Sequence, residues 1–521
     1  MTDANDSVRP SGGGRGKWVA AAFVVALALR IVAGTLASGD ELPGLTTWYV
    51  RLAATMASGH GLIMRSRLSA TAPDEGEGSN AGVAFMRQRQ AEGGRVDADH
   101  PYPQDVTGWL PVTMRPAGYP VLLYLLYRAG NYDGMVLGIR LAQALADALV
   151  CVLLFLFARN VFSPRVGLAA AWVYALLPSA MVSSMAMLLP DAFAMFLMAL
   201  VLCLASYARV GRGWMLIPTG LAIGLACQFR PEFLLLPVVV FMILWAWRRR
   251  FWSTLGWSAA MAAAFLLTMT PWMMWTQRAT GKAMLSTSNG GGSMYEALGE
   301  DPHNPFGVVL DDRWVEQDAV NRGFTSAWSA AANDCYYKKF KECVLSHPAY
   351  YAKLVLVNRL PLALVPPFNV REKTAKEKAA EEDFSFAKIA RQEGLTRWGV
   401  IAKYPGTVIR VFWREMTMVV VSAILLLAFV AANVARWRQW REQVWLVLPW
   451  AYVIAGICLT KQVDPRNVSS NLVVAAVALG MVVVWFVDPR RRRAAAKSAG
   501  PAVTAGEGHP FRGECSRGRT S

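Results

Sequence analysis

The sequence predicts an all-α membrane protein that crosses the bilayer about ten times and carries two large loops on one side. Three observations lead to this fold class. Hydrophobic residues make up 55% of the 521 residues and charged residues only 17%, whereas a soluble globular chain carries about 25% charged residues. Ten stretches reach or approach the ~20 apolar residues that a membrane helix needs. The basic residues, which give a formal net charge of +17, lie in short clusters beside these stretches.

Many of the apolar stretches end at a tryptophan, a residue that favours the membrane interface. Trp18, Trp272 and Trp485 are examples. The first stretch could instead be a cleaved signal sequence, but its length of 21 residues favours a retained helix. The predicted spans are 18–38, 134–158, 166–188, 190–208, 213–229, 231–247, 253–275, 413–435, 442–460 and 467–487.

One further apolar stretch, residues 115–130, is too short to cross. Between Arg115 and Arg128 it offers 12 residues, or about 18 Å of helix against a core of ~30 Å. If this stretch does not cross and the N-terminus is cytoplasmic, the basic clusters at 248–250 and 490–493 face the cytoplasm. We therefore expect a surface or re-entrant helix here, and both large loops on the extracytoplasmic side.

This topology sets the expected organisation of the chain. The segments are a cytoplasmic N-terminus (1–17), a first transmembrane helix (18–38), a first extracytoplasmic loop with juxtamembrane helices (39–133), a transmembrane bundle (134–275), a second extracytoplasmic loop or domain (276–412), C-terminal transmembrane helices (413–487) and a disordered basic cytoplasmic tail (488–521).

The two loops hold few features that indicate chemistry by themselves. Three consecutive glycines at 290–292 indicate a close backbone approach or a tight turn. Cys335 and Cys343 would be about 12 Å apart by rise alone on one continuous helix, so a disulfide requires a break in that helix. No zinc-type spacing occurs. No metal site is therefore assigned and no cofactor is certain, although a divalent cation is possible. The basic clusters beside apolar runs indicate no nucleic acid partner.

Charged residues at membrane level are costly and are functional candidates by default. Each candidate alone would be an ordinary polar helix end, but together they suggest one site that holds both acids and bases. Asp147 differs because it lies in the middle of a span, where it is expected to pair within the bundle. The candidates are Asp40 and Glu41 after the first span, Arg115 and Tyr119 at the surface helix, Asp191 before the fourth span, Arg230 and Glu232 before the sixth, and Lys461 and Arg466 between the last two.

This set of residues suits the transfer of a group from a phosphate-bearing donor. Arginine and lysine side chains at the level of the lipid headgroups can hold a phosphate or pyrophosphate. A carboxylate at the same level can act as general base on an acceptor hydroxyl or amine. Because the sequence shows no soluble nucleotide-binding domain, the donor would be carried by a lipid.

Several stretches carry a resemblance to a known family. "VTMRPAGYPVLLYLLY" precedes a surface helix, "LLPDAFAMFLMALVL" holds a Pro-Asp turn, and "GLAIGLACQFRPEFLLLPVVV" is a glycine-rich span that ends in Arg-Pro-Glu. "STSNGGGSMYEALGEDP" and "SHPAYYAKLVLVNRL" follow the seventh span, and "VDPRN" is a weaker match. In this order they resemble the GT-C superfamily of polytopic glycosyltransferases. The nearest group is protein-mannosyltransferase-like (glycosyltransferase family 39-like) and includes the aminoarabinose transferase that acts on lipid A. The resemblance covers residues 18–360, with a thinner fit to 487.

The resemblance implies that a hexosyl or pentosyl group is transferred with inversion from a polyprenyl-phosphate donor to a glycan, lipid or protein. The reaction would take place at the extracytoplasmic face of the cell's inner or plasma membrane. The family's general base lies just after the first span, which points to Asp40 or Glu41. The family's acid often lies only a few residues before a tyrosine, but Tyr49 comes nine residues after Asp40, so the choice of acid stays open. The resemblance also implies a secondary acid at Asp191 and donor-phosphate ligands at Arg115 and Arg230.

Two other functions remain as alternatives. A transporter or flippase of a lipid-linked glycan would favour inverted repeats and helices broken at mid-membrane, and no convincing repeat is present. A non-catalytic assembly partner is the third alternative. The sequence identifies neither the sugar nor the acceptor.

Overall fold

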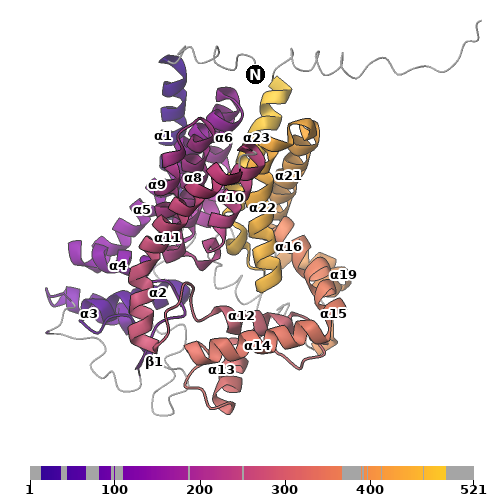
Figure 1. The fold of residues 1–521 in the computed structure, drawn as a ribbon. Coiled ribbons are helices and arrows are strands. Elements are labelled where there is room, and N and C mark those ends of the chain that lie inside the picture. The colour runs from indigo at the N-terminus through magenta and orange to yellow at the C-terminus, as the bar shows by residue number, and fades with distance from the viewer. Residues whose placement is uncertain are drawn as a thin grey trace, which may run out of the picture.

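The structure, a computed structural model, is helical over almost all of the residues it describes, which confirms the all-α fold class (Figure 1). Long apolar helices form a bundle, and shorter helices with a two-stranded sheet gather at one end of it, here called the loop end. The described residues are 13–36, 44–65, 81–95, 99, 109–185, 188–248, 251–366, 389, 392–395, 397–411, 413–461 and 463–487.

The bundle consists of helices from both halves of the chain. They are α1 (Gly13–Leu36), α5 (Tyr132–Val161), α6 (Pro164–Leu176), α7 (Pro178–Met185), α8 (Asp191–Arg209), η1 (Gly213–Met215), α9 (Leu216–Phe229), η2 (Pro231–Phe233), α10 (Leu236–Arg248), α11 (Phe251–Thr280), α21 (Trp413–Ala435), η5 (Trp437–Gln439), α22 (Trp440–Thr460), η6 (Pro465–Val468) and α23 (Asn471–Val487).

The loop end is built from the two long connections between these helices. The first supplies α2 (Gly44–Ala57), β1 (Ile63–Arg65), α3 (Ala81–Ala91), β2 (Trp109–Pro111) and α4 (Gly118–Ala129), with β1 antiparallel to β2. The second supplies α12 (Gly290–Glu296), η3 (Ala297–Glu300), α13 (Asp312–Asn321), α14 (Ala330–Ser346), α15 (Pro348–Lys353), η4 (Leu354–Arg359), α16 (Leu360–Leu364), α19 (Arg397–Lys403) and α20 (Pro405–Val411).

Six helices among the described residues are long and apolar enough to cross a membrane, or seven if α6 and α7 form one bent span. Shorter apolar helical segments lie at Gly213–Phe229, Pro231–Trp247 and Asn471–Val487. Each of the ten stretches predicted from the sequence coincides with one of these segments. The chain is therefore a multi-pass membrane protein, and the count of ten spans stays a prediction.

The span predicted at 166–188 consists of two helices with a bend between them rather than of one straight helix. α6 ends at Leu176, α7 begins at Pro178, and their axes differ by 56°. Proline has no amide hydrogen and disfavours helical backbone in the residue before it. Leu177 accordingly has extended backbone, with φ −73° and ψ 112°.

Asp147 pairs within the bundle, as expected. Its Oδ2 lies 2.6 Å from Nε of Arg30, and both side chains are fully buried. The hydroxyls of Tyr174 and Ser184 donate to the same carboxylate, at 2.5 and 3.1 Å. Arg30 also donates to the carbonyls of Tyr174 and Ala175. These carbonyls lie in the last turn of α6, where helical partners are missing, so Arg30 satisfies the backbone at the break.

Glycines set the spacing between α9 and α11. An added Cβ at Gly220 would lie 2.1 Å from the carbonyl oxygen of Met261, and one at Gly224 would lie 2.5 Å from Cβ of Thr268. Small residues four apart allow the backbones of two membrane helices to approach closely. The glycine-rich pattern before Arg230 is thus explained by helix packing.

Replacing Gly220 by alanine is expected to destabilise the protein, because the new methyl group would overlap the backbone of α11. Overpacking of this kind costs about 1–3 kcal/mol. Gly256→Ala is the matched control, since a Cβ there meets nothing within 4 Å. Thermal unfolding in detergent should give a lower midpoint for Gly220→Ala only. Equal midpoints for the two variants would contradict this packing.

The glycines at 290–292 also serve a close approach rather than a tight turn. A Cβ at Gly291 would lie 2.2 Å from the carbonyl oxygen of Asn333 in α14, and one at Gly292 would lie 3.0 Å from the ring of Trp328.

Cys335 and Cys343 lie on the continuous helix α14, and both are free thiols. The helix break that a disulfide between them requires is therefore missing.

Candidate functional site

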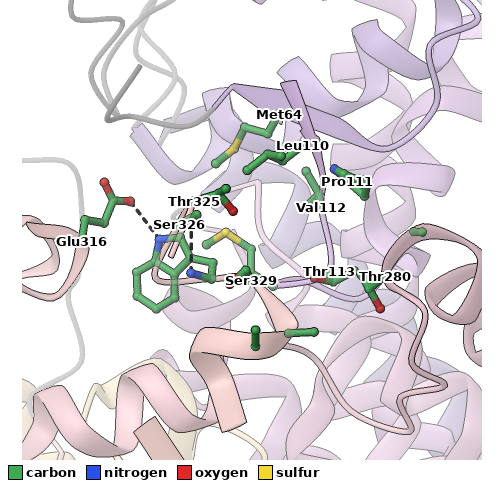
Figure 2. Close-up of a pocket in the computed structure, with 15 residues that line it drawn as sticks. Met64, Leu110, Pro111, Val112, Thr113, Thr280, Glu316, Thr325, Ser326 and Ser329 are labelled. Atoms are coloured by element: carbon green, nitrogen blue, oxygen red, sulfur yellow. Dashed lines mark hydrogen bonds between the residues drawn. The ribbon is translucent and has the colours of Figure 1, made fainter. Parts of the chain in front are cut away.

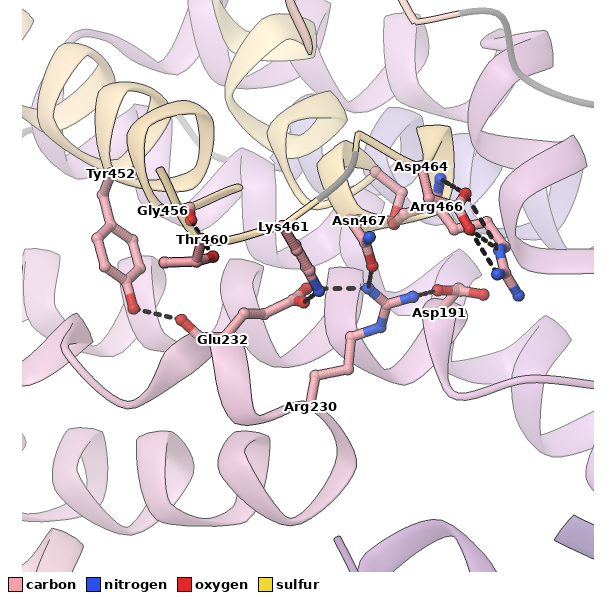
Figure 3. Close-up of polar contacts among 11 residues, drawn as sticks. Asp191, Arg230, Glu232, Tyr452, Gly456, Thr460, Lys461, Asp464, Arg466 and Asn467 are labelled. Atoms are coloured by element: carbon pink, nitrogen blue, oxygen red, sulfur yellow. Dashed lines mark hydrogen bonds and ion pairs between the residues drawn. The ribbon is translucent and has the colours of Figure 1, made fainter. Parts of the chain in front are cut away.

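Polar side chains from four segments meet at the loop end of the bundle (Figure 3). Asp191 is the first residue of α8 and follows Pro190, a position where the helix dipole favours a carboxylate. Arg230 directly follows α9 and has extended backbone, with φ −144° and ψ 120°, because Pro231 disfavours helix at the residue before it. Lys461 directly follows α22. These three charged residues therefore all lie at helix ends on the loop side of the bundle, and two of them are placed there by a neighbouring proline.

Arg230 is the centre of this polar cluster. Its Nη2 pairs with Oδ1 of Asp191, and its Nη1 lies 2.9 Å from Oε1 of Glu232. The same Nη1 donates to Oδ1 of Asn467 at 3.4 Å. On the other side of Glu232, the Nζ of Lys461 lies 3.6 Å from Oε2. The predicted residues Asp191, Arg230, Glu232 and Lys461 therefore form one connected network, which we call the charged cluster.

Arg466 lies beside this network and is held by its own partner. Its Nη2 is 2.5 Å from Oδ2 of Asp464, and its backbone N–H donates to Oδ1 of the same residue at 2.9 Å. Burial alone would raise the pKa of Asp464, but the charge and hydrogen bonds of Arg466 outweigh it and hold that pKa below its ordinary value. Asp464 thus remains an anion that fixes Arg466.

Aromatic side chains from the first connection line the same region. The guanidinium of Arg115 lies 5.9 Å from the ring centroid of Trp48, a distance typical of a cation–π contact. Tyr49 packs edge-on against Tyr119 at 5.0 Å, and Tyr119 lies 6.3 Å from Phe193 of α8. The predicted residues Arg115 and Tyr119 therefore belong to a wall between α2 and α8.

This wall is electrostatically coupled to the charged cluster. Burial lowers the pKa of Lys461, Glu232 opposes that shift, and the positive charges of Arg230 and Arg115 add to it. Burial lowers the pKa of Arg466, but the carboxylate of Asp464 and, to a smaller extent, Tyr49 outweigh it and raise that pKa above its ordinary value. Arg115 and Tyr49 of the wall are therefore electrostatic neighbours of Lys461 and Arg466.

The site has unused capacity to bind an anion. The Nε atoms of Arg115 and Arg230 are both buried and have no hydrogen-bond partner among the described residues. Leaving such a donor unpaired is costly, and an oxyanion is a suitable partner for it. Among the described residues, the site holds four cationic side chains (Arg115, Arg230, Lys461, Arg466) and three carboxylates (Asp191, Glu232, Asp464).

A pocket lies between the two loop connections (Figure 2). Its volume is about 270 Å³. Residues 110–114 form one wall and residues 325–331 another, and Thr113 and Met114 directly precede Arg115. The hydroxyls of Thr113 and Ser288 lie 2.8 Å apart, which joins the two connections at the pocket. The pocket is therefore a cavity between the two connections, and one of its walls continues in sequence into Arg115.

Several site features were not predicted from the sequence. Asp464 and Asn467 flank Arg466 but carried no separate signal, and Tyr452 looked like an ordinary residue of an apolar span. Asp40 and Glu41 lie outside the described residues.

No group of three or more His, Cys, Asp or Glu side chains that could hold a metal ion occurs in the described part of the chain. The possible divalent cation therefore gains no candidate ligands there.

Comparison with known proteins supports the resemblance read from the sequence. Residues 121–275 match the model of the family described as dolichyl-phosphate-mannose-protein mannosyltransferase. This region includes α5 to α10 and the Asp191 and Arg230 turns. No curated protein matches the chain at a significant level.

Similar solved structures come from an archaeal oligosaccharyltransferase. The crystal structure of the Archaeoglobus fulgidus enzyme with zinc and sulfate has a TM-score of 0.47 and 13% identity, and the match covers 92% of this chain and 51% of that one. The structure of AglB from the same organism with an inhibitory peptide and a dolichol-phosphate has a TM-score of 0.46 and 11% identity, covering 94% and 53%. This chain thus spans about half the length of the solved structures it matches, and likeness at this level says nothing about its own ligands.

Over residues 121–275, the part of the helical bundle that carries the Asp191 and Arg230 turns is therefore similar to the family described as dolichyl-phosphate-mannose-protein mannosyltransferase.

Proposed function

We propose that the protein is a glycosyltransferase that moves a sugar from a polyprenyl-phosphate donor to an extracytoplasmic glycan, lipid or protein. The single observation that carries the proposal is that the buried Nε of Arg230 in the charged cluster and that of Arg115 in the adjoining wall have no hydrogen-bond partner among the described residues. A phosphate of the donor would accept hydrogen bonds from Arg115 and Arg230. The matching family model also describes enzymes that use a lipid-linked phosphate donor.

The reaction needs a base, a nucleophile and a stabilised leaving group. A carboxylate removes the proton of the acceptor hydroxyl, and the oxygen attacks C1 of the sugar on the face opposite the phosphate. The bond between C1 and the phosphate oxygen then breaks, which inverts C1 and leaves the polyprenyl phosphate with an extra negative charge. Arg230 stabilises this developing charge more strongly than the ground state, which lowers the barrier, and Lys461 helps to bind the phosphate of the donor.

The base is proposed to be Asp40 or Glu41. The supporting observation is the position of α2, which begins at Gly44 and carries Trp48 and Tyr49 into the wall of the site. Glu41 precedes the start of α2 by three residues in the sequence, and a chain of three residues reaches at most about 10 Å. The active site would then face the extracytoplasmic side of the cell's inner or plasma membrane.

Release or transfer of sugar from a labelled polyprenyl-phosphate donor tests this proposal. With the purified chain in detergent, Asp40→Asn or Glu41→Gln should lower turnover by about a hundredfold or more, the usual contribution of a general base. Donor affinity, measured by competition with decaprenyl phosphate, should stay unchanged. Normal turnover in both single variants and in the double variant would rule out these two residues as the base.

The break between α6 and α7 is a feature that also occurs in transporters. In this chain, however, the freed carbonyls of Tyr174 and Ala175 are bound by the fully buried Arg30. The break is therefore sealed by the protein itself, and it does not favour a transport function over sugar transfer.

A further inference from the structure

We infer that Tyr351 and Arg359 are positioning residues, which hold the loop end of α22 and thereby place Lys461 for the donor phosphate. The inference rests on the proposed function of the charged cluster. It assigns a role to two residues that lie outside that cluster, in the stretch "SHPAYYAKLVLVNRL", for which the sequence indicated no chemical role.

The last turn of α22 is bound by groups from the second loop connection. Carbonyls at the end of a helix lack partners within it. Nη1 of Arg359 donates to the carbonyl of Cys458 at 3.0 Å, and the hydroxyl of Tyr351 donates to the carbonyl of Leu459 at 2.5 Å. The N–H of Lys461 itself bonds to the carbonyl of Ile457 at 3.1 Å. Three successive carbonyls, those of Ile457, Cys458 and Leu459, are thus fixed in the last turn before Lys461.

Arg359 is itself firmly held. Its Nε lies 2.9 Å from Oε2 of Glu300, and the two side chains are 1% and 7% exposed. Its Nη2 donates to the carbonyl of Ala297 at 2.6 Å. All three guanidinium nitrogens therefore have different acceptors, which suits the rigid donor geometry of arginine. Arg359 also ends a π-helical segment, η4, a conformation that is rare and frequent at functional sites.

α22 also holds the Arg-Pro-Glu turn of the charged cluster. The hydroxyl of Tyr452 donates to the carbonyl of Glu232 and accepts a hydrogen bond from the N–H of Leu235 at 3.2 Å. The side chain of Lys461 approaches the carboxylate of Glu232 at 3.6 Å. A shift of the end of α22 would therefore move Lys461 relative to Glu232 and Arg230.

Lysine depends on such backbone support more than arginine does. Its ammonium group is a point charge on a flexible stem, so its position relative to a phosphate is set largely by where its backbone lies. Loosening the end of α22 should weaken binding of the donor while leaving the chemical step to the base and Arg230. The expected signature is a higher KM for the donor with little change in kcat.

Tyr351→Phe tests this inference with the smallest change, because it removes only the hydroxyl that binds Leu459. We expect a KM for the polyprenyl-phosphate donor that is roughly fivefold higher, the usual effect of one hydrogen bond, with kcat unchanged. Tyr350→Phe is the matched control, because it removes the hydroxyl of the neighbouring tyrosine, whose ring packs edge-on against Phe306 at 5.7 Å. In a Lys461→Gln background, Tyr351→Phe should have no further effect, since the residue through which it acts is gone.

An unchanged KM, a loss confined to kcat, or the same fivefold effect in the Lys461→Gln background would overturn the inference. If the unaltered protein transferred no sugar, the proposed function would fail, and the same variants would be compared by their affinity for decaprenyl phosphate alone. Weaker binding by Tyr351→Phe, but not by Tyr350→Phe, would then support the positioning role. Equal affinity of the unaltered protein, Tyr351→Phe and Tyr350→Phe for decaprenyl phosphate would refute the positioning role.

Discussion

Replacing Arg230 by glutamine is expected to lower sugar transfer at least a hundredfold. Arg230 contacts Asp191, Glu232 and Asn467, and its buried Nε has no partner in the described part of the chain. In the proposed reaction it stabilises the charge that develops on the departing phosphate, and removal of one such donor costs about 10²–10³ in rate. The measurement is turnover of a labelled polyprenyl-phosphate donor by the purified variant.

A second variant separates catalysis from folding. Arg230→Gln leaves Asp191, whose side chain is 3% exposed, without its ion-pair partner, and a buried uncompensated charge destabilises a protein. The double variant Arg230→Gln/Asp191→Asn removes both charges and should recover thermal stability without recovering transfer. If transfer returned together with stability, Arg230 would be a structural residue only.

Replacing Asp147 by leucine is expected to lower the free energy of unfolding by about 3–5 kcal/mol, the usual cost of removing one partner of a buried ion pair. Arg30 would then keep a buried positive charge, with only the carbonyls of Tyr174 and Ala175 as acceptors. Arg30→Met should be at least as harmful, because it strands Asp147 and also frees those carbonyls. Unfolding in detergent, followed by heat or denaturant, measures the difference.

The double variant Arg30→Met/Asp147→Leu should recover much of this loss, because no isolated charge remains and apolar side chains pack well inside a bundle. Arg322→Gln serves as a comparison, since its pair with Asp318 lies at a partly exposed position and such pairs contribute about 1 kcal/mol or less. Equal losses for Asp147→Leu and Arg322→Gln would contradict the role given to the buried pair.

The membrane helices were predictable from the sequence, because a helix that crosses the bilayer must contain a long run of apolar residues. The break at Pro178 was missed because the apolar run continues through it. The effect of the proline is visible only in the extended backbone of the residue before it. Arg30 was missed for a similar reason: a single arginine within an apolar helix changes its mean hydropathy little. Its role becomes visible only when Asp147 is seen beside it.

The charged cluster was largely predictable, because topology placed Asp191, Arg230, Glu232 and Lys461 at the same end of their helices. The structure confirms that these four side chains are connected. Contacts made by ordinary helix residues could not be predicted. Tyr452 and Tyr351 reach backbone carbonyls far away in sequence, and no local pattern marks a tyrosine for such a contact.

The central claim is that the charged cluster binds the phosphate of a lipid-linked sugar and supports transfer. The most direct test reconstitutes the purified chain in liposomes with a labelled polyprenyl-phosphate sugar and an extract of cell-envelope glycans, lipids and proteins as acceptor. The account predicts that label moves to an acceptor, that decaprenyl phosphate competes, and that Arg230→Gln abolishes the transfer. Movement of the intact labelled lipid across the bilayer without sugar transfer, or full transfer by Arg230→Gln, would contradict it.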